Sequence, residues 1–260
     1  MTLSPRPAAV PRPFARRSAT GCAVVAILLL PVPAAAWSDS TRERMSQDVA
    51  RLLPTALAKQ VARNQRAHLE GWRDAPAPGA ADTAIETRVE AARQSLRKRE
   101  GGKAFVRSLG AVCRVVADAD DPLGGVSLAA VEMRTQGRAA DFDRYAQSVR
   151  GRAPVVFAGW ADGTALLADL PAFGTRVRDR AAADVDPLRR AYDADGRPDA
   201  SKRFDDRSVP FAIASLSWSR AVSDCANVIL AIWKSAGGDI AGTPWLDPKA
   251  APRPPAKGSS

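Results

Sequence analysis

Apolar residues recur at helical spacing along most of this chain. The clearest stripe runs through residues 209–236 and ends at two glycines, which commonly close a helix. Residues 104–121 carry a second stripe and residues 82–99 a third. Pro122 ends the second stripe, because proline lacks an amide hydrogen and clashes with the preceding turn. We therefore expect an all-α protein, a compact multi-helix bundle in which these three stretches are the long helices.

Proline and glycine divide the rest of the chain into shorter pieces. Pro54 separates two helices near the start of the bundle, and Pro171 and Gly174 are expected to interrupt a later helical pattern. Residues 155–159 form a short apolar run that is either a strand or a buried turn. The shorter helices are expected within residues 45–53, 57–69, 165–173 and 177–183.

The first 36 residues have the pattern of a secretory signal peptide. Four arginines and no acidic residue precede an apolar core at residues 22–30, and Ala34 and Ala36 stand at the cleavage positions. The apolar run is too short for a stable membrane span, although an uncleaved anchor is the alternative. We expect an exported chain, periplasmic or extracellular, that begins at Trp37 and has no membrane span after cleavage.

Charge and composition favour one helical domain with a mixed surface. Four of the charges that make up the net +10 lie in the signal peptide, which leaves +6. That surplus would favour an anionic, phosphate-bearing ligand, but acidic residues stand among the basic ones, which is typical of a solvated surface. Residues 243–260 are rich in proline and polar residues, so we expect a disordered tail. The domain itself is expected to cover residues 37–242.

One motif lies on the predicted helix at residues 104–121. Arg114 and Asp118 stand four residues apart, so their side chains project from one face of that helix. The surrounding pattern resembles the central helix of the secreted zinc-dependent phospholipase C and single-strand nuclease superfamily. Members of that family have histidine at the positions of Arg114 and Gly124. The chain keeps the other positions of the pattern, which are Leu109, Gly110, Asp118, Pro122 and Leu123.

The resemblance implies a helical bundle of the phospholipase C and nuclease type. In the family, three zinc ions are held by His, Asp and Glu side chains and by the amino group of an N-terminal Trp. Only Trp37, Asp74 and Asp118 correspond to such ligands here. The histidine of the first helix is missing, and a later His and Glu correspond to Phe142 and Ala146, which suggests a site filled by packing.

We therefore expect a vestigial site formed by Trp37, Asp74, Arg114 and Asp118. No cofactor is expected, and zinc on Trp37, Asp74 and Asp118 is the alternative, because carboxylates with one amino group bind zinc poorly. Arg114 is expected to lie against Asp118, with Asp74 as a further neighbour, in the space of the lost metal. The alternative is an ordinary exposed ion pair.

Three hypotheses for function follow from these residues. The first is a catalytically inactive exported protein that retains the scaffold of the family, a pseudoenzyme. The second is a phosphodiester hydrolase that acts on phospholipid or nucleic acid with a reduced metal site. The third is a cationic module for phospholipid headgroups or nucleic acid, which requires a basic cluster in the folded chain.

His68 is the only histidine, and Cys113 and Cys225 are the cysteines that follow the signal peptide. One imidazole cannot build a multi-histidine metal site, so we expect His68 to be a structural residue at the surface or half-buried in its helix. The two cysteines either form a disulfide in an oxidising compartment or pack as buried thiols, and the sequence leaves both alternatives open.

Overall fold

The computed structural model describes residues 37–74 and 84–246, and these residues form ten α-helices and one 3-10 helix, without a strand. The all-α prediction is therefore confirmed for this part of the chain. In chain order the elements are α1 (Asp39–Ala50), α2 (Thr55–Arg63), α3 (Gln65–Arg73), α4 (Ala84–Arg97), α5 (Gly102–Ala119), α6 (Leu128–Thr135), α7 (Arg138–Arg152), α8 (Gly163–Ala168), α9 (Leu170–Asp195), the 3-10 helix η2 (Ala200–Arg203) and α10 (Val209–Ser235).

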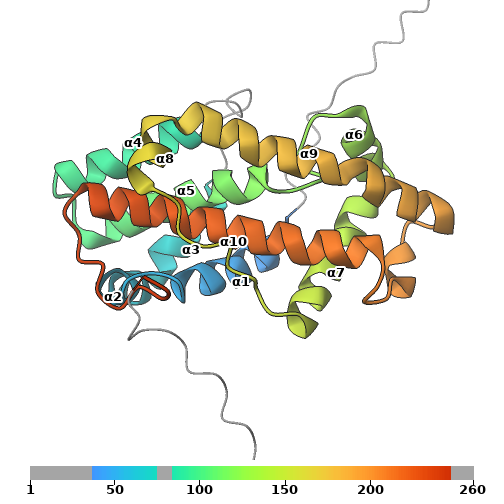
Figure 1. Ribbon diagram of the computed structural model, residues 1–260, viewed down its shortest axis with the longest axis horizontal. Coiled ribbons are helices and arrows are strands. Elements are labelled where there is room, and N and C mark those ends of the chain that lie inside the picture. The colour runs from blue at the N-terminus through green and yellow to red at the C-terminus, as the bar shows by residue number, and fades with distance from the viewer. Residues whose placement is uncertain (1–36, 75–83, 247–260) are drawn as a thin grey trace, which may run out of the picture. The chain divides into compact units, whose positions relative to one another are not determined.

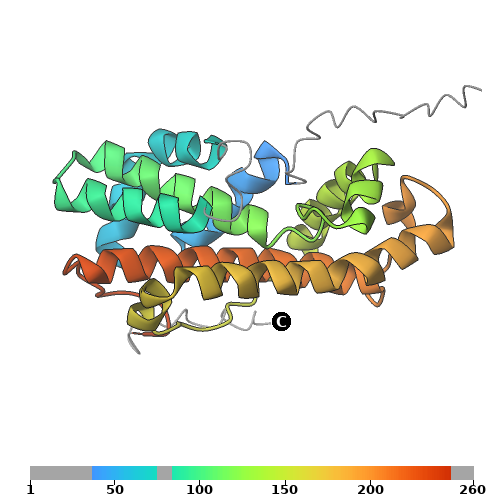
Figure 2. The same ribbon diagram turned by 90° about the horizontal axis from the view of Figure 1, so that it is seen from above.

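Helix α5 is the element against which most of the others pack. It contacts α1, α2, α3, α4, α9 and α10, and its buried residues cover almost every position from Phe105 to Ala117. Helices α9 and α10 run side by side in opposite directions and form one layer (Figure 1). Helices α4 and α5 form a second layer, which lies above the first in the second view (Figure 2). The core therefore lies between the α4–α5 layer and the α9–α10 layer.

The long amphipathic stretches form the predicted helices. Helix α10 spans Val209–Ser235, against the expected 209–236, and Ser208 caps it by accepting a hydrogen bond from the amide of Phe211. Helix α5 ends at Ala119, three residues before Pro122. Trp218 of α10 is buried, while Trp233 is half-buried against Phe105, so these tryptophans pack in and around the core.

The helical pattern is interrupted at Asp169, between α8 and α9, but the break expected at Gly174 is wrong, because one helix, α9, runs from Leu170 to Asp195. Pro171 stands in its first turn, where an amide hydrogen has no partner within the helix, so proline does not disrupt it. Gly174 is buried inside the helix, and a side chain there would approach Ile85 of α4. Pro171 is thus accommodated by its place at the start of α9, and Gly174 by the packing of α9 against α4.

Residues 154–162 are extended, but they are neither a strand nor a buried turn. They follow α7 and cross α10 before they reach α8 (Figure 1). Three side chains one turn apart on α10 bind this segment by hydrogen bonds to its backbone. Ser219, Ser223 and Asn227 accept from the amides of Val156, Ala158 and Ala161 at 3.1, 3.1 and 2.6 Å. Side-chain groups of a helix therefore replace a partner strand.

The folded region extends past the expected boundary at residue 242. Thr243 is fully buried, and the ring of Trp245 stacks on Phe157 at 5.2 Å. The expected signal peptide (1–36) and residues 247–260 of the expected tail lie outside the described residues. Within residues 37–74 and 84–246, no helix combines the length and the apolar run that a membrane span requires.

Candidate functional site

Asp118 lies between two arginine side chains, one from its own helix and one from α1. Arg114 donates through Nε to Oδ2 of Asp118, and Arg42 donates through Nη2 to Oδ1 at 3.1 Å. The side chains of Arg114 and Arg42 are only 9% and 6% exposed. The structure therefore places Arg114 against Asp118, in a buried network and not in an exposed pair.

Each guanidinium of this network has a second acceptor. Arg114 donates through Nη1 to the carbonyl of Trp72 at 3.3 Å, in the last turn of α3, where helix carbonyls lack partners within the helix. Arg42 also donates to Asp39 at 3.1 Å, but that carboxylate is 66% exposed. Two positive charges thus share one enclosed carboxylate and one exposed carboxylate.

Trp37 closes the same region from the start of the described chain. Its indole is buried against Phe142, with ring centroids 6.2 Å apart, and Nε1 donates to the carbonyl of Ala117 at 3.1 Å. Its backbone nitrogen donates to Oδ2 of Asp121 at 3.0 Å. Ala146 is buried as well, so Phe142 and Ala146 are both packed side chains.

Asp74 lies apart from this network. It accepts two hydrogen bonds from Arg107, from Nε and Nη2, each at 3.1 Å, and both side chains are substantially exposed. The expected contact between Arg114 and Asp74 is therefore replaced by an ion pair between the C-cap of α3 and the second turn of α5. The end of α3 packs against α5 at Arg107, so the guanidinium of Arg107, and not that of Arg114, binds Asp74.

Three residues that the sequence did not single out complete the region: Arg42, Asp121 and Asp143. Asp143 accepts from the amide of Ser38 at 3.1 Å and from the hydroxyl of Thr41 at 2.6 Å, so α7 holds the start of α1. The partners are separated by 76 to 105 residues in sequence. Asp121 stands directly before Pro122, and that position was the available signal for it, whereas no local pattern marks Arg42.

A zinc site does not fit these residues. Among the described residues, no group of three or more His, Cys, Asp or Glu side chains is arranged to hold a metal ion. Both oxygens of Asp118 already accept from guanidinium groups, and Asp74 is bound elsewhere. Arginine cannot coordinate a cation, because it stays protonated and has no acceptor. Arg42 and Arg114 thus oppose a metal at this position.

His68 is almost fully buried, whereas a surface or half-buried position was expected. Its Nδ1 lies 3.0 Å from the hydroxyl of Ser46, and its Nε2 has no hydrogen-bond partner among the described residues. The ring meets Trp72 edge to face at 6.4 Å. Burial lowers the pKa of His68 from 6.5 to about 4. The side chain is therefore a neutral core residue that joins α1 and α3.

We expect acidification below pH 6.5 to destabilise the wild type through His68. Because the folded-state pKa is below the unfolded one, the neutral ring stabilises the fold above pH 6.5, and this contribution is lost as the pH falls towards 4. Each pH unit in that window lowers the unfolding free energy by about 1.4 kcal/mol. Urea unfolding at pH 7 and pH 5 measures this slope, and His68→Asn should lose that part of it.

One buried and one half-buried carboxyl group act in the opposite sense, so the wild type and His68→Asn must be compared directly. Burial, and then the nearby Asp224 carboxylate, raise the pKa of Asp120 well above its usual range, against the effect of Arg180. Burial also raises the pKa of Asp184. Protonation of both carboxyls on acidification favours the fold. If the unfolding free energy changes equally with pH in the wild type and in His68→Asn, the pKa of His68 does not differ between the folded and unfolded states as expected.

Cys113 and Cys225 are two buried thiols in the structure. The Cys225 thiol donates to the carbonyl of Cys113 at 3.4 Å, which joins α10 to α5. Burial raises the pKa of the Cys225 thiol well above its usual range, so its thiolate is disfavoured. The pair acts as packing between the two layers of the core.

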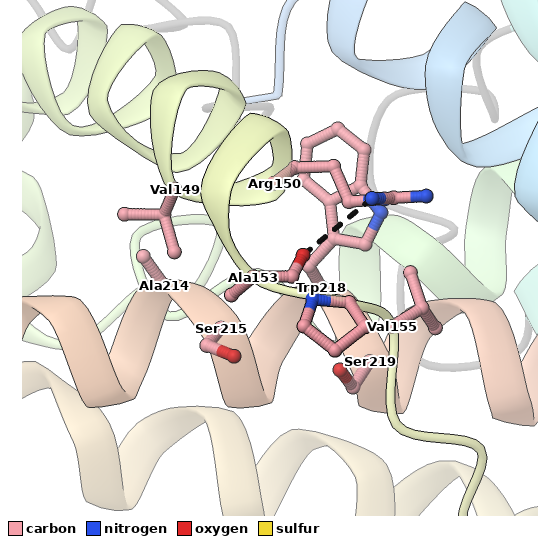
Figure 3. Close-up of a pocket in the computed structure, with 9 residues that line it drawn as sticks. Val149, Arg150, Ala153, Val155, Ala214, Ser215, Trp218 and Ser219 are labelled. Atoms are coloured by element: carbon pink, nitrogen blue, oxygen red, sulfur yellow. Dashed lines mark hydrogen bonds between the residues drawn. The ribbon is translucent and has the colours of Figure 1, made fainter. Parts of the chain in front are cut away.

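A second buried carboxylate, Asp48, joins α1 to α7 and α10. It accepts from Nε and Nη2 of Arg150 at 2.7 and 2.8 Å and from the indole of Trp218 at 3.0 Å. A cavity of about 10 Å³ lies beside Arg150 and Trp218 (Figure 3). That volume corresponds to about one water molecule, so we interpret this cluster as structural.

Comparison with protein families, with characterised proteins and with solved structures finds no match to this chain. The resemblance to the phospholipase C and nuclease superfamily therefore rests on the sequence pattern and stays a prediction. The class that the fold itself defines is an all-helical protein.

Proposed function

We propose that this chain is an exported helical protein with a scaffold of the phospholipase C and nuclease type and without its catalysis. The observation that carries the proposal is the pairing of Asp118 with Arg42 and Arg114. In the family pattern, the position of Arg114 is a zinc ligand. Here the same position supplies a positive charge to the carboxylate that the metal would otherwise neutralise.

The magnitude of the charge effect supports an inactive site. At an effective dielectric constant of about 20, unit charges about 4 Å apart interact by roughly 4 kcal/mol, so one guanidinium would oppose a dication there by roughly 8 kcal/mol. Structural zinc sites bind with roughly 10–16 kcal/mol. Two enclosed guanidiniums would thus offset most or all of the affinity of a complete ligand set, and this chain has an incomplete one.

The contact of the Trp37 nitrogen supports export with cleavage before this residue. Removal of residues 1–36 would convert that nitrogen into an α-ammonium group, and Asp121 Oδ2 lies 3.0 Å from it. In the family, the N-terminal amino group binds zinc. In this chain a carboxylate would take that role and neutralise the charge by a charge-assisted hydrogen bond.

The test is an activity and mass measurement on exported protein. The full chain is expressed with its N-terminal segment, and the chain recovered outside the cytoplasm should have the mass of residues 37–260. It should not hydrolyse bis(p-nitrophenyl) phosphate or single-stranded DNA, with or without added zinc. Turnover that depends on zinc would instead support a hydrolase with a reduced metal site, and a chain retained in the cytoplasm would contradict export.

A further inference from the structure

A cavity of about 400 Å³ lies between α4, α8 and α10, on helices that do not carry the Asp118 network. Arg93 of α4, residues of α8 and the last turns of α10 line it. Small-molecule sites usually have volumes of roughly 300–1,000 Å³, so the space suits a small ligand. The lining residues are Arg93, Gly163, Thr164, Leu167, Ala168, Ala231, Lys234 and Ser235.

Close packing of α8 on α10 fixes one wall of this cavity. A Cβ atom on Gly163 would stand 3.0 Å from Cβ of Ala231, so glycine permits α8 to begin directly against α10. Asp162 caps α8 by accepting from the amides of Thr164 and Ala165. The cavity is therefore bounded by packed helices on the α10 side and not by a loop.

The lining combines an apolar surface with two cations. Leu167, Ala168 and Ala231 supply the apolar part, whereas Arg93 and Lys234 supply positive charge, and no acidic side chain lines this described cavity. Within residues 37–74 and 84–246, Lys234 forms no ion pair, and Arg93 has only a 3.4 Å contact with Glu90. Both cations are thus available to a further anion.

The surroundings of the cavity are also basic. The end of α4, the turn that follows it and the start of α5 carry Arg97, Lys98, Arg99 and Lys103, with Glu100 as the one acid in residues 97–103. Both views place this turn at the same end of the bundle as the end of α10, where Lys234 stands (Figures 1 and 2). Cations near a helix C-terminus interact favourably with the negative end of the helix dipole, which explains why basic residues lie at the ends of α4 and α10. It does not explain the cavity beside them.

We propose that this cavity binds a small amphiphilic anion, with its charged head group between Arg93 and Lys234. The apolar part of the ligand lies against Leu167, Ala168 and Ala231, and the hydroxyl group of Thr164 donates to a head-group oxygen, whereas the hydroxyl of Ser235 already donates to the carbonyl of Ile232. A phosphate monoester and a carboxylate share this chemistry. The inference does not depend on the proposed function, since it uses none of the residues around Asp118.

Calorimetric titration of the wild-type protein with four probes tests the ligand class. Octyl phosphate or octanoate should bind, and the tighter of the two identifies the preferred head group. Inorganic phosphate, which lacks the apolar part, and octanol, which lacks the charge, should each bind at least tenfold more weakly. Absence of binding by both anionic amphiphiles, or equal binding of octanol, would overturn the proposal.

Three variants locate the binding site. Arg93→Gln/Lys234→Gln should weaken binding of the preferred probe at least tenfold. The matched control, Arg44→Gln/Lys202→Gln, removes the same charge from exposed positions on α1 and η2 and should leave the affinity within a factor of two. Ala168→Trp, at an exposed lining position, should fill the cavity and abolish binding while the charges remain. Equal effects of both double variants, or unchanged affinity in Ala168→Trp, would place binding elsewhere.

Discussion

Replacing Gly71 or Gly110 by alanine is expected to destabilise the bundle more than any other single methyl group added to it. These glycines lie where α3 crosses α5. A Cβ atom on Gly71 would stand 2.0 Å from the carbonyl oxygen of Arg107, and one on Gly110 would stand 2.1 Å from that of His68. Both obstacles are backbone atoms, so no side chain can rotate away and the helices must separate.

Overpacking of a core typically costs 1–3 kcal/mol, and we expect about 3 kcal/mol or more for either variant because two backbones must move. For a domain of this size, such a loss lowers the melting temperature by roughly 6–12 °C. Thermal unfolding followed by circular dichroism measures the shift. Gly151→Ala is the matched control, because nothing lies within 4 Å of its added Cβ in α7, and alanine there should be neutral or slightly stabilising.

A melting temperature of Gly71→Ala or Gly110→Ala that equals that of Gly151→Ala would contradict the close crossing of α3 and α5. Gly110 belongs to the Leu-Gly pair of the motif on which the family resemblance rests. In this chain its role is explained by packing, since it admits the backbone of α3 at His68.

Removing the Asp118 carboxylate is the second change with a large expected effect. Asp118→Ala leaves Arg42 and Arg114 enclosed without their shared acceptor, and loss of one partner of a buried ion pair costs about 3–5 kcal/mol. Arg114→Ala should cost less, because Arg42 still neutralises Asp118. Urea unfolding of the two single variants and the double variant gives the coupling energy between the side chains.

We expect a coupling energy between Arg114 and Asp118 of about 1–3 kcal/mol, towards the upper part of the range for residues in one network. Arg66 and Glu70 are the matched control pair, since they are also four residues apart but the arginine side chain is 92% exposed. Such exposed helical pairs couple by about 0.3–0.5 kcal/mol. If the coupling energy of Arg114 and Asp118 is no larger than that of the control pair, the enclosed pair stabilises the fold no more than an exposed ion pair does.

Long stretches with one strong period were predictable, because burial of a single helix face repeats along the sequence. That is why α5 and α10 agree with their expected ranges within a few residues. Helix α9 was not predictable in the same way, since the effect of Pro171 depends on whether it stands in the first turn or in the interior. The extended segment at 154–162 was missed because its partners are serines and an asparagine on a distant helix.

The candidate site was predictable only where its residues are close in sequence. Arg114 and Asp118 share one helix face, so their contact follows from helical spacing. Arg42 and Asp121 entered only in the folded chain, because their partners come from other elements. Asp74 was misplaced for the same reason, since the choice between Arg107 and Arg114 depends on how α3 lies along α5.

The zinc content of the purified protein tests the central claim most directly, which is that two arginines hold Asp118 in place of a metal. The protein is incubated with excess zinc, dialysed without chelator and examined by elemental analysis. We expect far less than one zinc ion per chain. Zinc in near-stoichiometric amount, retained by the wild type and lost in Asp118→Ala, would contradict the claim.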